Sequence, residues 1–133
     1  MAIKTYSFNK EEKLKSRKMI ETLFRDGKAF SVFPYRVIYM HASLHTDKYP
    51  VQAGFSVSSR KFPHAVDRNR IKRLGREAYR IQKQSLYDAL RESGAQLAVF
   101  FIYTDKKIAD FDILSRKFSV ILEKLTREAV RKD

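Results

Sequence analysis

The sequence predicts one α+β domain of 133 residues, in the order α-β-β-α-β-α, with a sheet packed against helices. Two observations lead to this fold class. Apolar residues make up 44% of the chain, and they alternate between segments with helical spacing and short β-branched or aromatic runs. Only four glycines and three prolines are present, and no linker separates two regions, so residues 1–133 are expected to form a single domain.

The N-terminal half is predicted to fold as one helix followed by two strands. Asn9 can cap a first helix that Gly27 ends, because Asn accepts backbone N–H bonds and Gly suits a helix terminus. The run Phe33–Met40 is rich in β-branched and aromatic residues and predicts a strand. After a polar connection at His41–Tyr49, the run Val51–Ser58 predicts a second strand, antiparallel to the first.

The C-terminal half is predicted to contain one buried strand between helices. A helix is expected over about Ala65–Lys83, with a shorter helical stretch at Ser85–Glu92 that Gly94 breaks. The nearly unbroken apolar run Gln96–Tyr103 has the composition of a central strand buried on both faces. Asp110 then caps a last helix. The apolar face of this helix is expected to comprise Phe111, Leu114, Phe118, Ile121, Leu122 and Leu125.

The charge of the chain is large and unevenly distributed. Lys and Arg total 28 against 15 Asp and Glu, which gives a formal net charge of +13. Residues 60–83 carry 9 basic and 2 acidic side chains, so more than half of the excess falls in this segment. An anionic partner would relieve the self-repulsion, and the concentration of charge predicts an RNA- or DNA-binding surface.

Other classes find less support in the sequence. No apolar run reaches the roughly 18–20 residues that cross a bilayer, and no secretory signal is evident. There is no cysteine, which excludes disulfides and thiolate metal sites. We therefore expect a cytoplasmic protein with no membrane partner and no obligate protein partner. A basic amphipathic helix can also lie on a membrane or bind calmodulin, but this one has few large apolar residues and no Trp.

The basic segment Arg68–Lys83 is amphipathic when its residues are projected about 100° apart, as in an α-helix. One face is apolar and comprises Ile71, Leu74, Ala78 and Ile81. The other is polar and comprises Arg68, Asn69, Lys72, Arg73, Arg76, Arg80 and Lys83. Residues three or four apart lie about 5–6 Å apart on a helix, and an Arg guanidinium grips a phosphate with two hydrogen bonds. A charged face is usually only solvated, but here only Asp67 and Glu77 interrupt the cations, which favours nucleic-acid contact.

The stretch Phe55–Arg80 resembles the signature of the bacterial ribonuclease P protein component. That family's pattern is a strand ending in a small polar turn, followed by a basic helix that reads RNRIKRLIRE or close to it. Here Arg68–Glu77 reads RNRIKRLGRE. Phe24–Gly27 also matches a Phe-x-x-Gly at the end of the family's first helix. Length, element order and charge agree as well, so the resemblance spans most of the chain.

The resemblance implies a protein subunit of a ribonucleoprotein endoribonuclease that removes the 5′ leader of precursor tRNA. Family members bind a catalytic RNA subunit through the basic helix, and the single-stranded leader through a cleft between the first helix and the sheet. The RNA subunit performs the cleavage with Mg²⁺, so no catalytic residue and no metal ligand are expected on the protein. The family fold also contains a left-handed β-α-β crossover, which general rules would have predicted to be right-handed.

Two sets of residues are expected to bind RNA when the family's sites are carried over by position. Contacts with the catalytic RNA are expected at Ser58, Arg60, Lys61, Arg68, Asn69, Arg70, Lys72, Arg73, Arg76 and Arg80. Contacts with the tRNA leader are expected at Phe24, Tyr35, Arg36 and Tyr39. An exposed aromatic ring stacks on any base with about 1–3 kcal/mol, which suits a variable leader. The alternative is that these aromatic side chains belong to the core.

Three positions depart from the family pattern. Gly75 stands where an aliphatic residue is usual, so it either permits close packing or weakens the helix by about 1 kcal/mol. The turn Ser59–His64 is one residue longer than in common members and lacks their Gly. Ile20 replaces a second aromatic residue of the cleft.

Two other functions remain open. A general RNA- or DNA-binding module, for example a ribosomal protein, would use the same helix without preferring precursor over mature tRNA. A stand-alone nuclease would need a nucleophile with a base, or a metal site, and neither is evident. His41 and His45 have zinc-like spacing only if they are helical, and no third ligand is near them.

Overall fold

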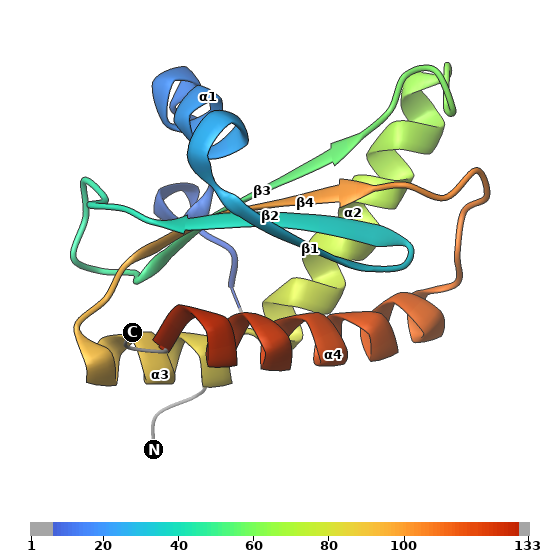
Figure 1. Cartoon of the computed structure of the whole chain (residues 1–133). Helices are drawn as coiled ribbons and strands as arrows, with labels where there is room; N and C mark the ends of the chain where they lie inside the picture. The colour runs from blue at the N-terminus through green and yellow to red at the C-terminus, as the bar shows by residue number, and fades with distance from the viewer. Residues whose placement is uncertain (1–6, 131–133) are drawn as a thin grey trace.

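The computed structural model describes residues 7–130 and shows a four-stranded sheet with helices on both faces (Figure 1). In chain order the elements are the 3₁₀ turn η1 (Lys10–Glu12), α1 (Arg17–Asp26), β1 (Lys28–Val32), β2 (Tyr35–His41), β3 (Val51–Val57), α2 (Ala65–Gln82), α3 (Gln84–Ser93), β4 (Leu97–Tyr103) and α4 (Phe111–Val130). In Figure 1, α1 lies above the sheet and α3 and α4 lie below it, while α2 packs against β3 and α4. The predicted α+β class is confirmed.

The strands lie in the order β1-β2-β4-β3. β2 pairs antiparallel with both β1 and β4, and it begins at Tyr35 because Phe33 and Pro34 form the hairpin turn. β1 is a short edge strand outside the predicted ones. β3 runs antiparallel to β2, as predicted, but its hydrogen-bonded neighbour is β4, to which it is parallel. Parallel neighbours need a crossover connection, which α2 and α3 provide. The left hand of this crossover stays a prediction from the family resemblance.

The continuous helix expected from Asn9 to Gly27 is wrong, because the chain forms two pieces there. Lys13 pairs with Ala53 beside β3, and this extended backbone separates η1 from α1. α1 begins after the cap Ser16, whose hydroxyl accepts a backbone N–H, and it ends at Gly27 as expected. Pairing with a strand distant in sequence therefore overrides the local helical pattern.

The C-terminal half follows the predictions closely. α2 ends at Gln82, and α3 ends at Gly94, whose φ of 74° favours glycine. β4 lies inside the sheet between β2 and β3, as expected for an apolar strand. α4 buries its predicted apolar face except for Phe111, which is half-buried.

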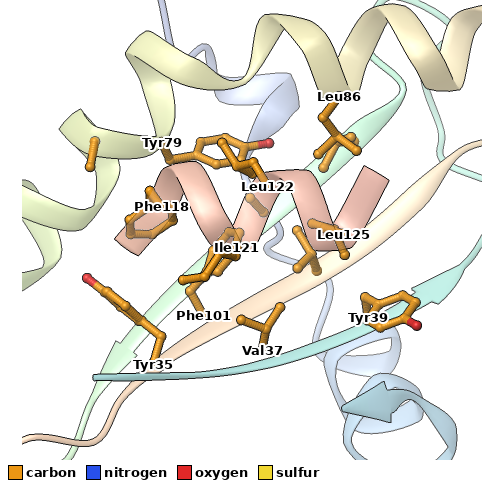
Figure 2. Close-up of a cluster of buried hydrophobic side chains, with 14 of the residues drawn as sticks. Tyr35, Val37, Tyr39, Tyr79, Leu86, Phe101, Phe118, Ile121, Leu122 and Leu125 are labelled. Carbon is orange, nitrogen blue, oxygen red and sulfur yellow. The ribbon is translucent and has the colours of Figure 1, made fainter. Parts of the chain in front are cut away.

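The main core lies between the sheet and the helices α2, α3 and α4. Figure 2 shows Tyr35, Val37 and Tyr39 pointing from β2 toward α4. A smaller cluster on the other face holds α1 on the sheet through Leu23 and Ile38. Because α1 covers only part of that face, the rest of it is available for a cleft.

Lys83, expected on the cationic face of α2, is instead buried, with 6% of its surface exposed. Its ammonium group pairs with the fully buried carboxylate of Glu12, which also accepts a hydrogen bond from the Tyr87 hydroxyl at 2.7 Å. Burial lowers the pKa of Lys83, and the bond to Glu12 opposes that shift. The network fastens η1 to the junction of α2 and α3, so Lys83 is not available to a partner.

Candidate nucleic-acid interface

Five polar residues of α2 lie on its outward side or at the border of that side. Asn69, Arg70 and Arg73 are exposed, and Lys72 and Arg76 are half-buried. Within residues 7–130, none of the four cations lies within ion-pair distance of an acid. Their charge is therefore not compensated locally, and this face attracts anions.

Arg80 differs from these cations because it has an acidic neighbour. Its guanidinium lies 2.5 Å from a carboxylate oxygen of Glu77, one turn earlier in α2. The hydrogen bond from Arg80 lowers the pKa of Glu77, which keeps the carboxylate charged. Arg80 is therefore a weaker candidate for a phosphate contact than the sequence predicted.

The helix is rotated relative to the two faces predicted from the sequence. The buried residues of α2 are Ile71, Gly75, Ala78 and Tyr79. Their mean direction differs by about 60° from that of the predicted apolar face. Ile81, predicted to be apolar core, is 38% exposed. The outward face is centred on Arg73 and Lys72 lies on its flank, whereas the half-buried Arg68 lies nearer the buried side.

Gly75 accounts for this rotation by allowing α2 to lie close to the sheet. A Cβ atom on Gly75 would lie 2.7 Å from the Tyr35 hydroxyl oxygen and 3.4 Å from Cδ2 of Phe55. Close packing is therefore the role of this glycine. The Tyr35 hydroxyl is buried and has no hydrogen-bond partner in the described part of the chain. Burial also raises the pKa of Tyr35.

Arg68 shapes the turn that precedes α2. Its guanidinium donates to the carbonyl oxygens of Phe62 and Pro63, both at 2.9 Å. The Phe62 N–H closes the same turn by donating to the Ser58 carbonyl at 3.0 Å. Part of the donor capacity of Arg68 is thus used within the protein.

The turn extends the positive surface beyond the start of α2. Ser58, Arg60 and Lys61 are all exposed on it. The Lys61 ammonium group donates to the carbonyl of Thr104, which ties the turn to the loop after β4. We call the exposed polar residues of this turn, together with those of the outward face of α2, the basic surface.

A second candidate surface lies beside α1, on the sheet face opposite the main core. Phe24 of α1 is 48% exposed, and its ring centroid lies 5.2 Å from that of Phe100 on β4. Arg36 of β2 is exposed and shares its strand face with Ile38, which packs in the cluster under α1. Phe24 and Arg36, two of the predicted leader contacts, therefore lie on the same side of the sheet.

The assignment of Tyr35 and Tyr39 to the leader-binding face beside α1 is wrong. Their side chains are 2% and 5% exposed and belong to the main core on the opposite face (Figure 2). Successive side chains of a strand point to opposite faces, so Arg36 and its neighbour Tyr35 cannot share one. Buried in this way, neither ring offers a face to a base.

The sequence did not point to the other residues of this sheet face, which β3 and β4 provide. Phe100 and Ile102 of β4 are half-buried, and so are Gly54 and Ser56 of β3. A Cβ atom on Gly54 would lie 3.0 Å from the Phe100 ring, so glycine leaves room for that ring. The alternation with Ala98, which is buried under α1, would have placed Phe100 and Ile102 on this face.

The residue types needed for a metal site do not converge in the described structure. Among residues 7–130, no three His, Asp or Glu side chains are grouped so that they could hold a metal ion. Nε2 of His41 lies 2.7 Å from the carbonyl oxygen of Ala129. None of the helices in this range is long and apolar enough to cross a bilayer.

Comparison with known protein families gives a match over most of the chain. The family model described as Ribonuclease P matches residues 8–126. A ribonuclease P protein component from Porphyromonas gingivalis is 40% identical over 112 residues, which cover 84% of this chain and 81% of the relative. One from Chlorobium phaeobacteroides is 34% identical over 128 residues, covering 90% of this chain and 88% of the relative.

Solved structures share the fold at much lower sequence identity. The RNase P protein of Staphylococcus aureus superimposes with a TM-score of 0.70 at 17% identity, covering 92% of this chain and all of the other (100%). The RNase P protein of Thermotoga maritima gives a TM-score of 0.66 at 20% identity, covering 85% and 96% of the two chains. These likenesses support the arrangement of helices and strands described above.

Proposed function

The chain belongs to the ribonuclease P protein component family, and on that premise we propose that it binds the catalytic RNA subunit and the 5′ leader of precursor tRNA. Membership associates the chain with ribonuclease P, the ribonucleoprotein nuclease of tRNA processing. The basic surface would hold the catalytic RNA, and the cleft beside α1 would hold the leader.

The observation that carries the proposal is the separation of core and charge on α2. Its buried side packs against the sheet and α4, so the helical backbone that carries the exposed Asn69, Arg70 and Arg73 need not reorganise to meet a phosphate backbone. Holding donors on a rigid element lowers the entropy lost on binding. Asn69 can also donate and accept at a ribose hydroxyl or a base edge.

The leader cleft is supported by its mixture of ring, apolar floor and cation. Phe24 and Phe100 lie in contact, and each keeps part of its surface accessible. Arg36 supplies a guanidinium on the same face, suited to a phosphate. Stacking of this kind tolerates any base, which suits leaders of varying sequence.

In this proposal the RNA subunit with Mg²⁺ performs the hydrolysis, and the protein contributes binding and orientation. The His, Asp and Glu side chains of residues 7–130 are not grouped to hold such an ion. The side chains described for α2 and the cleft act by holding the RNA chain and its leader in place.

Affinity for precursor and mature tRNA, measured with the assembled ribonucleoprotein, tests the proposal. A preference for the precursor that disappears when the protein is omitted is the expected result. Neutralising about six phosphates on duplex RNA should give a log–log salt slope of roughly −5 for binding of the catalytic RNA. Equal affinity for both tRNAs would favour a general nucleic-acid-binding module instead.

A variant pair separates the basic surface from overall charge. Arg73→Ala removes the cation at the centre of the outward face, whereas Arg127→Ala removes an exposed cation at the far end of α4. We expect roughly tenfold weaker binding of the catalytic RNA for Arg73→Ala only, as for loss of one charge-assisted contact. Equal effects of the two substitutions would contradict a specific surface.

A further inference from the structure

We propose that the start of α1 holds the phosphate backbone of the 5′ leader through Arg17, with Lys15 before the helix cap and Lys18 in the first turn adding positive charge beside it. The leader would then be bound by charge at one end of the cleft and by stacking at the other. This inference rests on the proposed leader-binding function and adds residues that the family resemblance did not assign to the cleft.

The three cations are exposed and unneutralised at the start of α1. All are exposed, and in residues 7–130 no acid lies within ion-pair distance of any of them. α1 has no acidic residue in its first turn, where acids would be favoured and cations are not. The free protein therefore holds these charges together at a cost that a bound polyanion would remove.

The position of Arg17 on α1 places it beside the cleft. Residues seven apart in a helix differ by only about 20° in direction and lie about 10 Å apart along the axis. Arg17 and Phe24 are therefore on the same flank of α1. Phe24 contacts Phe100 on the cleft floor, which identifies this flank as the one that borders the cleft.

Hydrogen bonds to β3 fix the backbone that carries these cations. The Leu14 N–H donates to the Ala53 carbonyl at 3.0 Å, and Lys13 pairs with the same residue. The Ser16 hydroxyl then accepts the Met19 N–H at 3.2 Å and caps α1. The backbone that carries the cations is thus held beside β3 before any ligand binds.

Ile20 explains why charge is the interaction available at this end. It is half-buried and packs in the cluster with Leu23 and Ile38 that holds α1 on the sheet. Among residues 7–130, the α1 residue at this position, one turn before Phe24, is thus aliphatic and not aromatic. From Phe24 to Arg17 the wall of the cleft therefore changes from aromatic to cationic, which suits bases at one end and phosphates at the other.

The test uses the assembled ribonucleoprotein and precursor tRNAs with leaders of graded length. Arg17→Glu/Lys18→Glu should weaken binding of the longest leader roughly tenfold or more and leave mature tRNA unaffected. For Arg17→Ala/Lys18→Ala, the slope of log affinity against log salt concentration for the long leader should become shallower by about 1.4. Each lost contact with a single-strand phosphate contributes about 0.7 to this change. Affinity for the RNA subunit alone should stay unchanged.

A matched control removes two cations elsewhere. Lys106→Ala/Arg116→Ala takes away two exposed charges after β4 and on α4, and it should change neither the leader dependence nor the slope. The Arg17→Glu/Lys18→Glu variant also serves as a control for folding. Acids in the first turn should stabilise α1, so the melting temperature of this variant should be at or above that of wild type. Should the Glu variant unfold, the Ala variant carries the same comparison.

Two outcomes overturn the inference. One is that the α1 variants behave like the control at every leader length. The other is that they weaken mature tRNA or the RNA subunit as much as the long precursor. If wild type itself fails to prefer precursor, the proposed function is what fails, and the two failures are thereby distinguished.

Discussion

Replacing Gly75 with alanine should destabilise the protein, although alanine is the better helix former. The new methyl group would lie 2.7 Å from the Tyr35 hydroxyl oxygen, so α2 or the ring must shift. Overpacking of this kind costs about 1–3 kcal/mol, and helix propensity returns about 1 kcal/mol. We expect the free energy of unfolding to fall by about 1 kcal/mol.

Tyr35→Phe should reverse the sign of that effect. The Tyr35 hydroxyl has no partner in the described part of the chain, so removing it breaks no hydrogen bond there and ends a desolvation cost of about 1–3 kcal/mol. The methyl group added at Gly75 then fills the vacated space, and Phe55 at 3.4 Å remains in ordinary contact. Gly75→Ala/Tyr35→Phe should exceed wild type by about 2–4 kcal/mol, with a coupling energy of about 2 kcal/mol, which is the overpacking cost that loss of the hydroxyl removes.

Urea unfolding of wild type, the two single variants and the double variant measures this coupling. Tyr79→Phe is the control, because the Tyr79 hydroxyl donates to the Tyr87 hydroxyl at 3.1 Å and its loss should cost about 1 kcal/mol. If the effects at Gly75 and Tyr35 add within about 0.5 kcal/mol, the contact between them does not explain the glycine.

Three further predictions concern α2, the buried ion pair and pH. Arg68→Ala should lower stability by about 1–2 kcal/mol in urea unfolding as well as weaken RNA binding, whereas Arg73→Ala should weaken binding alone. Glu12→Gln leaves the buried Lys83 without its carboxylate and should cost about 3–5 kcal/mol by the same assay, with the exposed Glu123→Gln unchanged as control. Above the ordinary tyrosine pKa of 10.0, stability should fall, because burial raises the pKa of core tyrosines and the unfolded chain releases protons that the folded chain keeps. The tyrosines concerned are Tyr35, Tyr79 and Tyr87. Unfolding free energies that rise between about pH 9 and pH 11 would contradict this sign.

The basic surface could be located from the sequence because its charge is concentrated in one short segment. Arg70 and Arg73 are exposed there, as a cationic helix face requires. The rotation of α2 could not be predicted, since a glycine has no side chain to mark a buried position. The burial of Lys83 was equally hidden, because its partner Glu12 lies on a segment far away in the chain.

Only some of the residues on the sheet face beside α1 could be predicted from the sequence. Alternation along β2 separates Arg36 from Tyr35 and Tyr39, but it does not show which face of the strand is covered by the core. The β4 segment is apolar throughout, so the sequence does not show which of Phe100 and Phe101 faces the main core. The structure decides this, because α4 covers one face of the sheet and α1 covers part of the other. Phe24 lay in the matched motif at the end of α1 and contacts Phe100 on this sheet face, and its role in leader binding stays a prediction.

The sequence by itself determined the kinds of elements, the interior position of β4 and the segment that carries the charge, because periodicity and local composition are properties of neighbouring residues. Only the tertiary structure decided which strands pair, how far α2 turns about its axis and which cations stay exposed. Those outcomes depend on contacts such as Gly75 with Tyr35, Lys13 with Ala53 and Lys83 with Glu12. Each joins residues distant in the chain, and their free energy appears only when the helices and the sheet pack together.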